Sequence, residues 1–527
     1  MRSLNLEKLL TISIIIGVII SFWIFARFTV DDAFISWRYG KNLADFGIWN
    51  YSPNILDMTQ AYTNPIYAIL SIVPNYFNID VVLFFKIVSL LNLFLFVVYM
   101  IKKTGKYKTV LLFFILPATM IHLFSGLETF LFVSLLVVLF VNLYENNFKS
   151  SILITILLFL TRPETWLFVA LTPFYFLIKN LEIDFSNIKI FFQKLLIRDN
   201  FNFKDFFISI IILGFVLGSY FLFHKYHFGY ALPNTFYIKS GSFFNPILFI
   251  WFAIVAIPLV VIFSTKKYHL FIIFTLFFFA LILSYSTSDL QMNYAERFAY
   301  HIFAPLFFIL IFLSTKLNEP IYYISKMENG KPFFILKPNL YLNVIAIIFL
   351  TLFFFKSTNI STIKLSDYYP RGLDSHAELG KKLNEIKNKY GVKSFSQGDA
   401  GMTAYHSELL ALDNIGLGSS MVAQSKEVNY NILNQYNPEI LSFHAKPGEI
   451  FLDSYSQKTI LEWGKERNYK YRCDVYWRKD YTMAIYSKDS FDELQQVCKS
   501  SEQLNNISSK DYILKMIKKS PFSYWHE

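Results

Sequence analysis

The stretch LLTISIIIGVIISFWIF at residues 9–25, followed by DDAFISWRY at residues 31–39, decides the architecture of this chain. The first run carries no charge and can cross a bilayer, which takes about 17–25 apolar residues. No small-residue cleavage site follows it before Asp31, so we interpret it as a retained anchor. Asp31 and Asp32 then come to the membrane surface. Such neighbouring like charges repel unless a metal, a cation or a proton lies between them.

Composition identifies an integral membrane protein. Of the 527 residues, 54% are hydrophobic and 19% aromatic, which is far more apolar than a soluble protein of mixed composition. We expect an α-helical polytopic protein with about eleven spans. The predicted spans are residues 9–28, 80–101, 109–124, 127–144, 151–161, 165–178, 206–223, 244–264, 269–285, 298–315 and 339–355.

The basic residues are placed as in a membrane protein. A net charge of +11 would suit a nucleic-acid partner, but most Lys and Arg residues fall in one set of alternate loops. That asymmetry predicts a cytoplasmic N-terminus in the cytoplasmic (inner) membrane and no nucleic-acid partner. The opposite loops hold Arg27, Arg38, Lys41, Arg162, Lys225, Lys239 and Arg297.

The last third of the chain is more polar and predicts a soluble domain. We expect a membrane-embedded module over residues 1–355, including an outer loop at 29–64, and an extracytoplasmic α/β domain over residues 356–527. A helix at 374–390 should end at Gly391. Strands are expected at 392–396, 409–412 and 440–443, followed by a helix near 457–467 and a hairpin at 471–486. The spacing of Cys473 and Cys498 leaves open whether they form a disulfide.

Polar residues gather in the outer loops and at the adjacent span ends. A helix over 32–45 would place Asp31 and Arg38 along one stripe, so an acid and a guanidinium would share a face. Each group also has a structural interpretation. Asp31 and Asp32 could cap a helix, and Arg162 with Glu164 could be a solvated pair. Acids beside cations on one face suit a site that binds an anionic lipid headgroup and also holds a proton acceptor. The candidate binding residues are Arg38, Asn64, Glu128, Arg162, Glu164, Asn234, Lys239, Arg297 and His301.

An ordered series of short motifs resembles the GT-C polytopic glycosyltransferases. Within them, the resemblance is to the terminal β-(1→2) arabinofuranosyltransferases of cell-wall assembly. It is spread over most of the chain, and the ordered set is more specific than any one motif. The motifs are DDAFISWRY at 31–39, NLADFG at 42–47, YTNP at 62–65, SGLET at 125–129, TRPE at 161–164, LPNTFYIK at 232–239, RF at 297–298 and GDAG at 398–401.

The resemblance implies an enzyme that moves a sugar, with inversion, from a polyprenyl-phosphate donor to a cell-envelope glycan or glycolipid outside the membrane. Carried over residue by residue, it makes Asp31 the general base and lets Asp32 position the acceptor, a divalent metal or the sugar. Arg162, Lys239 and Arg297 would bind the leaving phosphate. A hydroxyl needs a base, and a departing phosphate needs cationic stabilisation. Because the two acids are adjacent, either could be the base.

Two other functions compete with glycosyl transfer. A transporter or flippase of lipid-linked sugars would also have many spans and intramembrane charges, but it should place polar groups near mid-bilayer in paired repeats. Here the polar groups gather at one end of the spans, and no repeat is evident. A polysaccharide polymerase or ligase is the second rival, and the Asp-Asp loop after the first span disfavours it.

Overall fold

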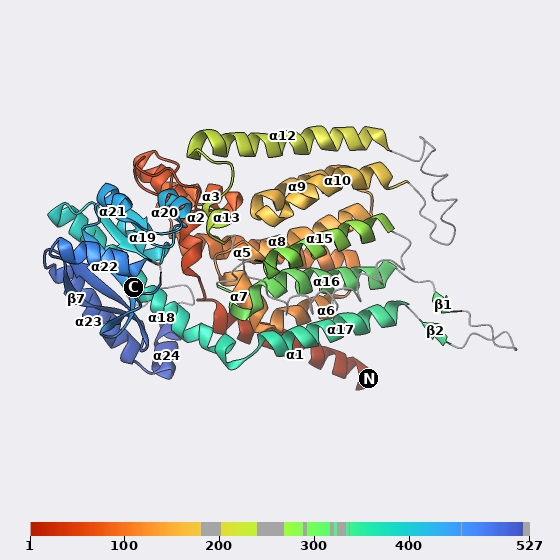
Figure 1. The fold of residues 1–527 in the computed structure, drawn as a ribbon. Helices are drawn as coiled ribbons and strands as arrows, with labels where there is room; N and C mark the ends of the chain where they lie inside the picture. Colours follow the sequence, from red (N-terminus) through yellow and green to blue (C-terminus); the bar gives the residue numbers. More distant parts are fainter. Residues whose placement is uncertain are drawn as a thin grey trace.

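The computed structural model describes residues 2–180, 202–239, 268–287, 292–316, 321–323, 334–336, 338–454 and 456–519. A bundle of apolar helices carries a sheet domain at one end, and the N-terminus lies at the other end (Figure 1). The helices up to the domain are α1 (Arg2–Phe25), α2 (Asp31–Phe46), α3 (Pro65–Leu70), α4 (Ile72–Tyr76), α5 (Val81–Thr104), α6 (Tyr107–Leu112), α7 (Pro117–Phe124), α8 (Thr129–Tyr144), α9 (Phe148–Thr161), α10 (Trp166–Ile178), α12 (Phe203–Phe228), α13 (Asn234–Lys239), α15 (Tyr268–Ser286), α16 (Arg297–Lys316) and α17 (Pro338–Ser357), with 3₁₀ turns η1 (Phe113–Ile115), η2 (Pro163–Thr165) and η4 (Tyr294–Glu296).

Apolar helices make this chain a multi-pass membrane protein. Six described helices are long and apolar enough to cross a membrane, and a pair bent by 78°, Tyr107–Ile115 with Pro117–Phe124, could supply a seventh crossing. The apolar helices α8, α9 and α10 have 16, 14 and 13 residues. Ten of the predicted spans overlap the six long helices, the bent pair or the three shorter helices. The remaining predicted span, 244–264, lies outside the described residues. The count of eleven spans therefore stays a prediction.

The bundle is layered around α16. Of its apolar stretch, 94% is buried, against 11% for α12, so α16 is a core helix and α12 lies at the edge of the bundle (Figure 1). The bend before α7 has a local cause. Pro117 stands in the first turn of α7, where a missing N–H is tolerated, and proline cannot continue the preceding helix. The chain thereby turns toward the start of α2, where the Val30 amide donates to the Ser125 carbonyl at 3.0 Å.

The sheet domain follows α18 (Ile360–Tyr390), which ends at Gly391 in the left-handed conformation as predicted. Its strand order is β4-β3-β5-β8-β7, with β6 beside β5; β3 runs parallel to β4 and β5, and the other pairs are antiparallel. A separate pair, β1 (Ile321–Tyr323) and β2 (Phe334–Leu336), lies at the far end of the bundle (Figure 1). The domain strands are β3 (Ser394–Gln397), β4 (Leu410–Asp413), β5 (Ile440–Lys446), β6 (Glu449–Ile450), β7 (Lys470–Arg478) and β8 (Tyr481–Ser487).

Helices cover both faces of this sheet. One apolar core joins the sheet to α18 and α23, and a second joins it to α20, α21 and α22. Cys473 of β7 and Cys498 of α23 form a disulfide, which answers the question that their spacing left open. The predicted strands, the helix near 457–467 and the hairpin are confirmed, whereas several short helices had not been predicted. The domain helices are α19 (Met402–Ser407), α20 (Ser420–Ser425), α21 (Tyr430–Tyr436), α22 (Gln457–Glu466), α23 (Asp492–Asn506) and α24 (Ser509–Lys519).

Buried polar contacts join the sheet domain to the loop between α2 and α3. The Asp57 carboxylate accepts hydrogen bonds from Ser419, Ser420 and Tyr436. Tyr51 donates to the Ala400 carbonyl at 2.5 Å. Asp57, Ser419 and Ser420 are 3% exposed or less, so removing one partner would leave an unsatisfied buried group. The domain and this loop therefore form one polar interface above the bundle.

An ion pair at the edge of this interface should make stability depend on pH. Lys41 of α2 lies 3.0 Å from Glu408 of the domain, and Lys387 lies 3.1 Å from it. Partial burial alone would raise the pKa of Glu408, but the two ammonium groups outweigh burial and lower this pKa to about 2. The stabilisation is therefore complete above the unfolded pKa of about 4.3 and is lost as the pH falls toward about 2.

We expect Glu408→Gln to lower the free energy of unfolding by about 1–2 kcal/mol at about pH 7, after allowing for solvent screening. The difference should shrink by about pH 3, where the unfolded carboxyl is already protonated. Thermal unfolding of the two proteins at both pH values measures this. Exposed Glu427→Gln is the control and should leave both melting temperatures unchanged. An equal loss at both pH values would contradict the ion-pair explanation.

Candidate functional site

A cavity of about 460 Å³ opens where the bundle meets the domain. This volume lies within the range of about 300–1,000 Å³ that small-molecule sites occupy. Its walls come from α2, the YTNP and SGLET loops, η2, the start of α13, the end of α15 and the start of α16. Leu417 adds a side chain from the sheet domain. Motifs from well-separated parts of the chain thus meet around one space.

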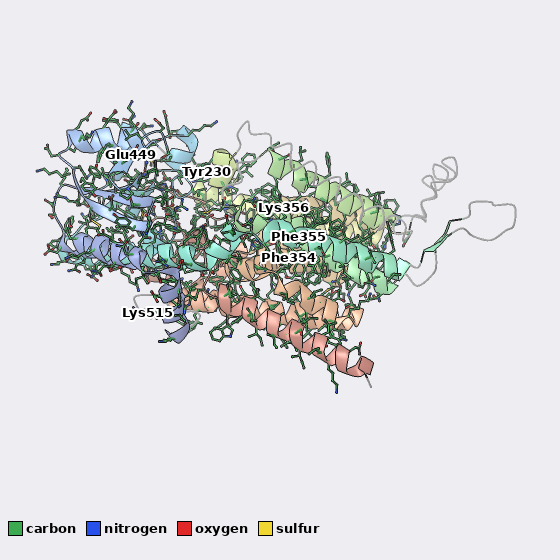
Figure 2. The ribbon with its side chains drawn as sticks, turned by 90° about the horizontal axis from the view of Figure 1, so that it is seen from below. Tyr230, Phe354, Phe355, Lys356, Glu449 and Lys515 are labelled. Carbon is green, nitrogen blue, oxygen red and sulfur yellow. A yellow bond between two sulfur atoms is a disulfide. The ribbon has the colours of Figure 1, made fainter. Side chains whose placement is uncertain are left out.

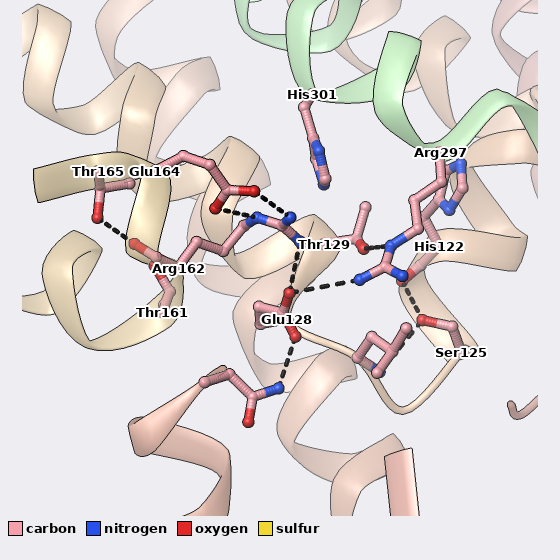
Figure 3. A network of polar contacts seen from close by, with 12 residues as sticks. His122, Ser125, Glu128, Thr129, Thr161, Arg162, Glu164, Thr165, Arg297 and His301 are labelled. Carbon is pink, nitrogen blue, oxygen red and sulfur yellow. Dashed lines mark hydrogen bonds and ion pairs between the residues drawn. The ribbon is translucent and has the colours of Figure 1, made fainter. Parts of the chain in front are cut away.

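Glu128 lies at the centre of the polar wall. Its side chain is 2% exposed, and its carboxylate lies 2.7 Å from the Arg162 guanidinium and 3.5 Å from that of Arg297 (Figure 3). Asn64 donates to its second oxygen at 2.6 Å. The glycine of SGLET brings Glu128 here. Gly126 has a φ of +79°, and a Cβ on it would lie 2.8 Å from the Trp37 ring of α2.

The two arginines are held very differently. Arg162 donates a hydrogen bond to Glu128 at 2.7 Å and two to Glu164 at 2.7 and 3.2 Å. Pro163 favours the extended backbone of Arg162, with φ −153° and ψ 138°, which places it between these acids. Arg297 instead makes contacts of 3.5 Å to Glu128 and 3.3 Å to Thr129. Reorienting the Arg297 side chain toward an incoming anion should therefore cost less free energy than reorienting that of Arg162.

The structure separates the two adjacent acids. Asp32 lines the cavity, whereas Asp31 is not among its lining residues. Both oxygens of Asp31 accept backbone hydrogen bonds from the domain, from Gly401 at 2.9 Å and from Met402 at 2.7 Å. Successive residues of a helix point about 100° apart, so only one of the two can face the cavity. Asp31 therefore holds the domain to α2, and Asp32 is presented to the cavity.

Four other predicted residues, Arg38, Asn234, Lys239 and His301, are absent from the described lining of the cavity. Buried Arg38 donates to the Leu409 carbonyl at 2.6 Å, and its guanidinium lies 4.6 Å from the centre of the Tyr51 ring. Asn234 donates to the carbonyls of Gly416 and Leu417. Both therefore position loops and backbone around the site. Lys239 is the last residue of α13, and its side chain lies outside the described part of the chain.

His301 lies directly behind the cavity wall. Its Nδ1 is 2.7 Å from the hydroxyl of Tyr285, which lines the cavity. Figure 3 shows the ring pointing toward the space between Arg162 and Arg297. Its Nε2 is buried without a hydrogen-bond partner. His301 thus supports the wall and leaves one ring nitrogen for a further polar contact.

Aromatic side chains form the part of the site that sequence reasoning missed. They offer flat apolar faces beside the charged wall, which suits a ligand with both apolar and polar parts. Tyr62, Phe236 and Phe298 stand inside the motifs named above but were not chosen as candidate binding residues. Trp166 follows the TRPE motif by two residues. Tyr285 and Leu417 lie away from these motifs. The aromatic lining residues are Tyr62, Trp166, Phe236, Tyr285 and Phe298.

Glu128 should be the main structural anchor of the charged wall. We expect Glu128→Gln to lower the free energy of unfolding by about 3 kcal/mol, because Arg297 loses its ion-pair partner and Arg162 loses one of its two. Thermal unfolding in detergent measures this. Glu296→Gln is the matched control, since Glu296 is 28% exposed and lies 3.7 Å from Lys356, and it should cost under about 1 kcal/mol. Equal losses in the two variants would contradict the anchoring role.

No group of three or more His, Cys, Asp or Glu side chains within the described ranges is arranged to hold a metal ion. The divalent metal suggested for Asp31 and Asp32 stays a prediction. Both oxygens of Asp31 accept from backbone amides, whereas Asp32 lines the cavity. Comparison of the chain with protein-family models, with characterised proteins and with solved structures gave no match.

Proposed function

We propose that this protein is a membrane glycosyltransferase that moves a sugar from a polyprenyl-phosphate donor to a cell-envelope glycan or glycolipid. One observation carries the proposal: a single cavity at the end of the apolar bundle combines the carboxylate of Asp32 with the guanidinium groups of Arg162 and Arg297. Transfer from a phosphate to a hydroxyl needs a proton acceptor and a cation on opposite sides of the reacting carbon. The aromatic walls suit the sugar rings.

In the proposed reaction, Asp32 takes the proton from the acceptor hydroxyl, whose oxygen attacks the anomeric carbon. The bond from that carbon to the phosphate oxygen breaks, and its electron pair stays on the leaving polyprenyl phosphate. Arg297 binds this phosphate, and Arg162, held by Glu128 and Glu164, keeps the wall cationic beside it. Attack opposite the leaving group inverts the anomeric centre. Asp31 acts indirectly, by holding α2 and therefore Asp32 in place.

The orientation of the protein is part of the proposal. The positive-inside rule supports a cytoplasmic N-terminus, and α2 with the sheet domain lies at the opposite end of the bundle (Figure 1). The disulfide between Cys473 and Cys498 supports an oxidising compartment for this domain. An extracytoplasmic site would meet its acceptor where envelope glycans are assembled.

The direct test is a transfer assay with the purified protein in liposomes and a panel of polyprenyl-phosphate sugars. Transfer of labelled sugar to an added glycan acceptor, with release of polyprenyl phosphate, is the expected result. A flippase would instead move the donor between leaflets and leave its sugar–phosphate bond intact. Donor translocation without product on any acceptor would therefore overturn the proposal.

A further inference from the structure

The last described helix, α24, has two different sides. Tyr512 and Met516 are each 1% exposed and face the protein. The Tyr512 hydroxyl donates to Asp374 at 3.0 Å, and the guanidinium of Arg371 lies 4.6 Å from the centre of the Tyr512 ring. These contacts fix α24 to α18. Its remaining side chains are therefore held in a defined direction.

A contact with Arg27 places α24 at the level where the first span ends. Arg27 follows the end of α1 by two residues, and its guanidinium donates to the Met516 carbonyl. Figures 1 and 2 both show α24 beside the domain end of α1, and Figure 2 labels Lys515 there. Since α1 is a candidate membrane span over Glu7–Phe25, its end at Phe25 would mark the boundary between lipid and water, and α24 lies beside that end.

The outward side of α24 is both apolar and basic. Ile513 and Leu514 are 38% and 47% exposed. The helix contains four lysines and a single acid, Asp511. Lys510, Lys515 and Lys518 are exposed. Near the domain end of α1, Trp23 and Ile24 are also about half exposed, so the end of this span presents apolar side chains as well. An apolar strip flanked by lysines is typical of helices that lie in a membrane interface.

We propose that α24 docks on the surface of the bilayer, with Ile513 and Leu514 at headgroup level and its lysines on anionic phospholipid. The charge of the lysines complements such a surface, and the helix needs no other partner to cover its apolar residues. The sheet domain is then attached to the membrane at two places. One is α18, which follows the apolar helix α17, and the other is α24. This inference does not depend on the reaction that the cavity performs.

Collision measurements on single nitroxide labels test the docking. The native cysteines are joined in a disulfide, so Leu514→Cys gives one labelling site in the full-length protein. Ile348→Cys, on a 49% exposed residue near the middle of α17, is the lipid reference. Glu449→Cys, on an exposed residue far from α24 in Figure 2, is the water reference. In liposomes containing phosphatidylglycerol, the label at 514 should collide with oxygen and be shielded from a water-soluble nickel chelate. A label at 514 that behaves as the one at 449 would overturn the proposal.

A second arm tests the lysines. In liposomes of phosphatidylcholine alone, the label at 514 should regain access to nickel. Replacing Lys510, Lys515 and Lys518 by Gln should remove the difference between the two lipids, while circular dichroism confirms that the protein is folded. Equal nickel access in both lipids for the unsubstituted helix would overturn the role of anionic headgroups.

Discussion

Asp32→Asn is expected to lower the rate of sugar transfer by about 10²–10⁴-fold, the usual effect of losing a positioned general base. Asn keeps the size of the side chain but cannot accept the hydroxyl proton at neutral pH. The acidic side chain lines the cavity, so the substitution should leave donor binding and the folded structure largely unchanged. Single-turnover transfer with a fixed donor, together with donor binding and thermal unfolding, measures the three effects separately.

Asp31→Asn is the matched control, because it makes the same chemical change one residue away. The two backbone amides of Gly401 and Met402 both donate to Asp31. Asn can accept from one of them and presents an N–H₂ group to the other. We expect a loss of about 1.5–3 kcal/mol in stability and a smaller effect on transfer than for Asp32→Asn. Near-normal transfer by Asp32→Asn, with loss of transfer in a folded Asp31→Asn protein, would reverse the assignment and favour Asp31 as the base.

Much of the fold could be predicted because its signals are local. Long apolar runs identify the spans, and Gly391 marks the end of α18 because it can adopt a left-handed conformation. The apolar helix α9 has only 14 residues, so length alone leaves the number of crossings open. The bend before α7 depends on Pro117, whereas the apolar run at 109–124 predicts one continuous span. Short helices such as α20 are held by tertiary contacts and gave little periodic signal.

The sequence predicts which residues belong to the candidate site, but it does not predict how their side chains are placed. Charge asymmetry and the motifs placed Asp32, Glu128, Arg162 and Arg297 near one side of the bundle, and all four line the cavity. The choice between Asp31 and Asp32 depends on the amides at residues 401 and 402, about 370 positions away in sequence. No local pattern carries that information. No local pattern predicts that Leu417 lines the cavity either, because it is distant in sequence from the other lining residues.

Arg297→Gln is expected to weaken donor binding and to lower the transfer rate by about 10²–10³-fold, as expected when one group that stabilises developing negative charge is removed. Its fold should survive, because Glu128 keeps its 2.7 Å contact with Arg162. Arg297→Lys should recover part of the activity, since an ammonium retains the charge but not the planar fork that binds phosphate at two points. Polyprenyl phosphate should raise the melting temperature of the unsubstituted protein and have little effect on Arg297→Gln. Arg478→Gln, which removes a half-exposed arginine on the sheet domain, is the control for loss of charge alone. If Arg297→Gln retained both full transfer and stabilisation by polyprenyl phosphate, the leaving phosphate would have to bind elsewhere in the cavity.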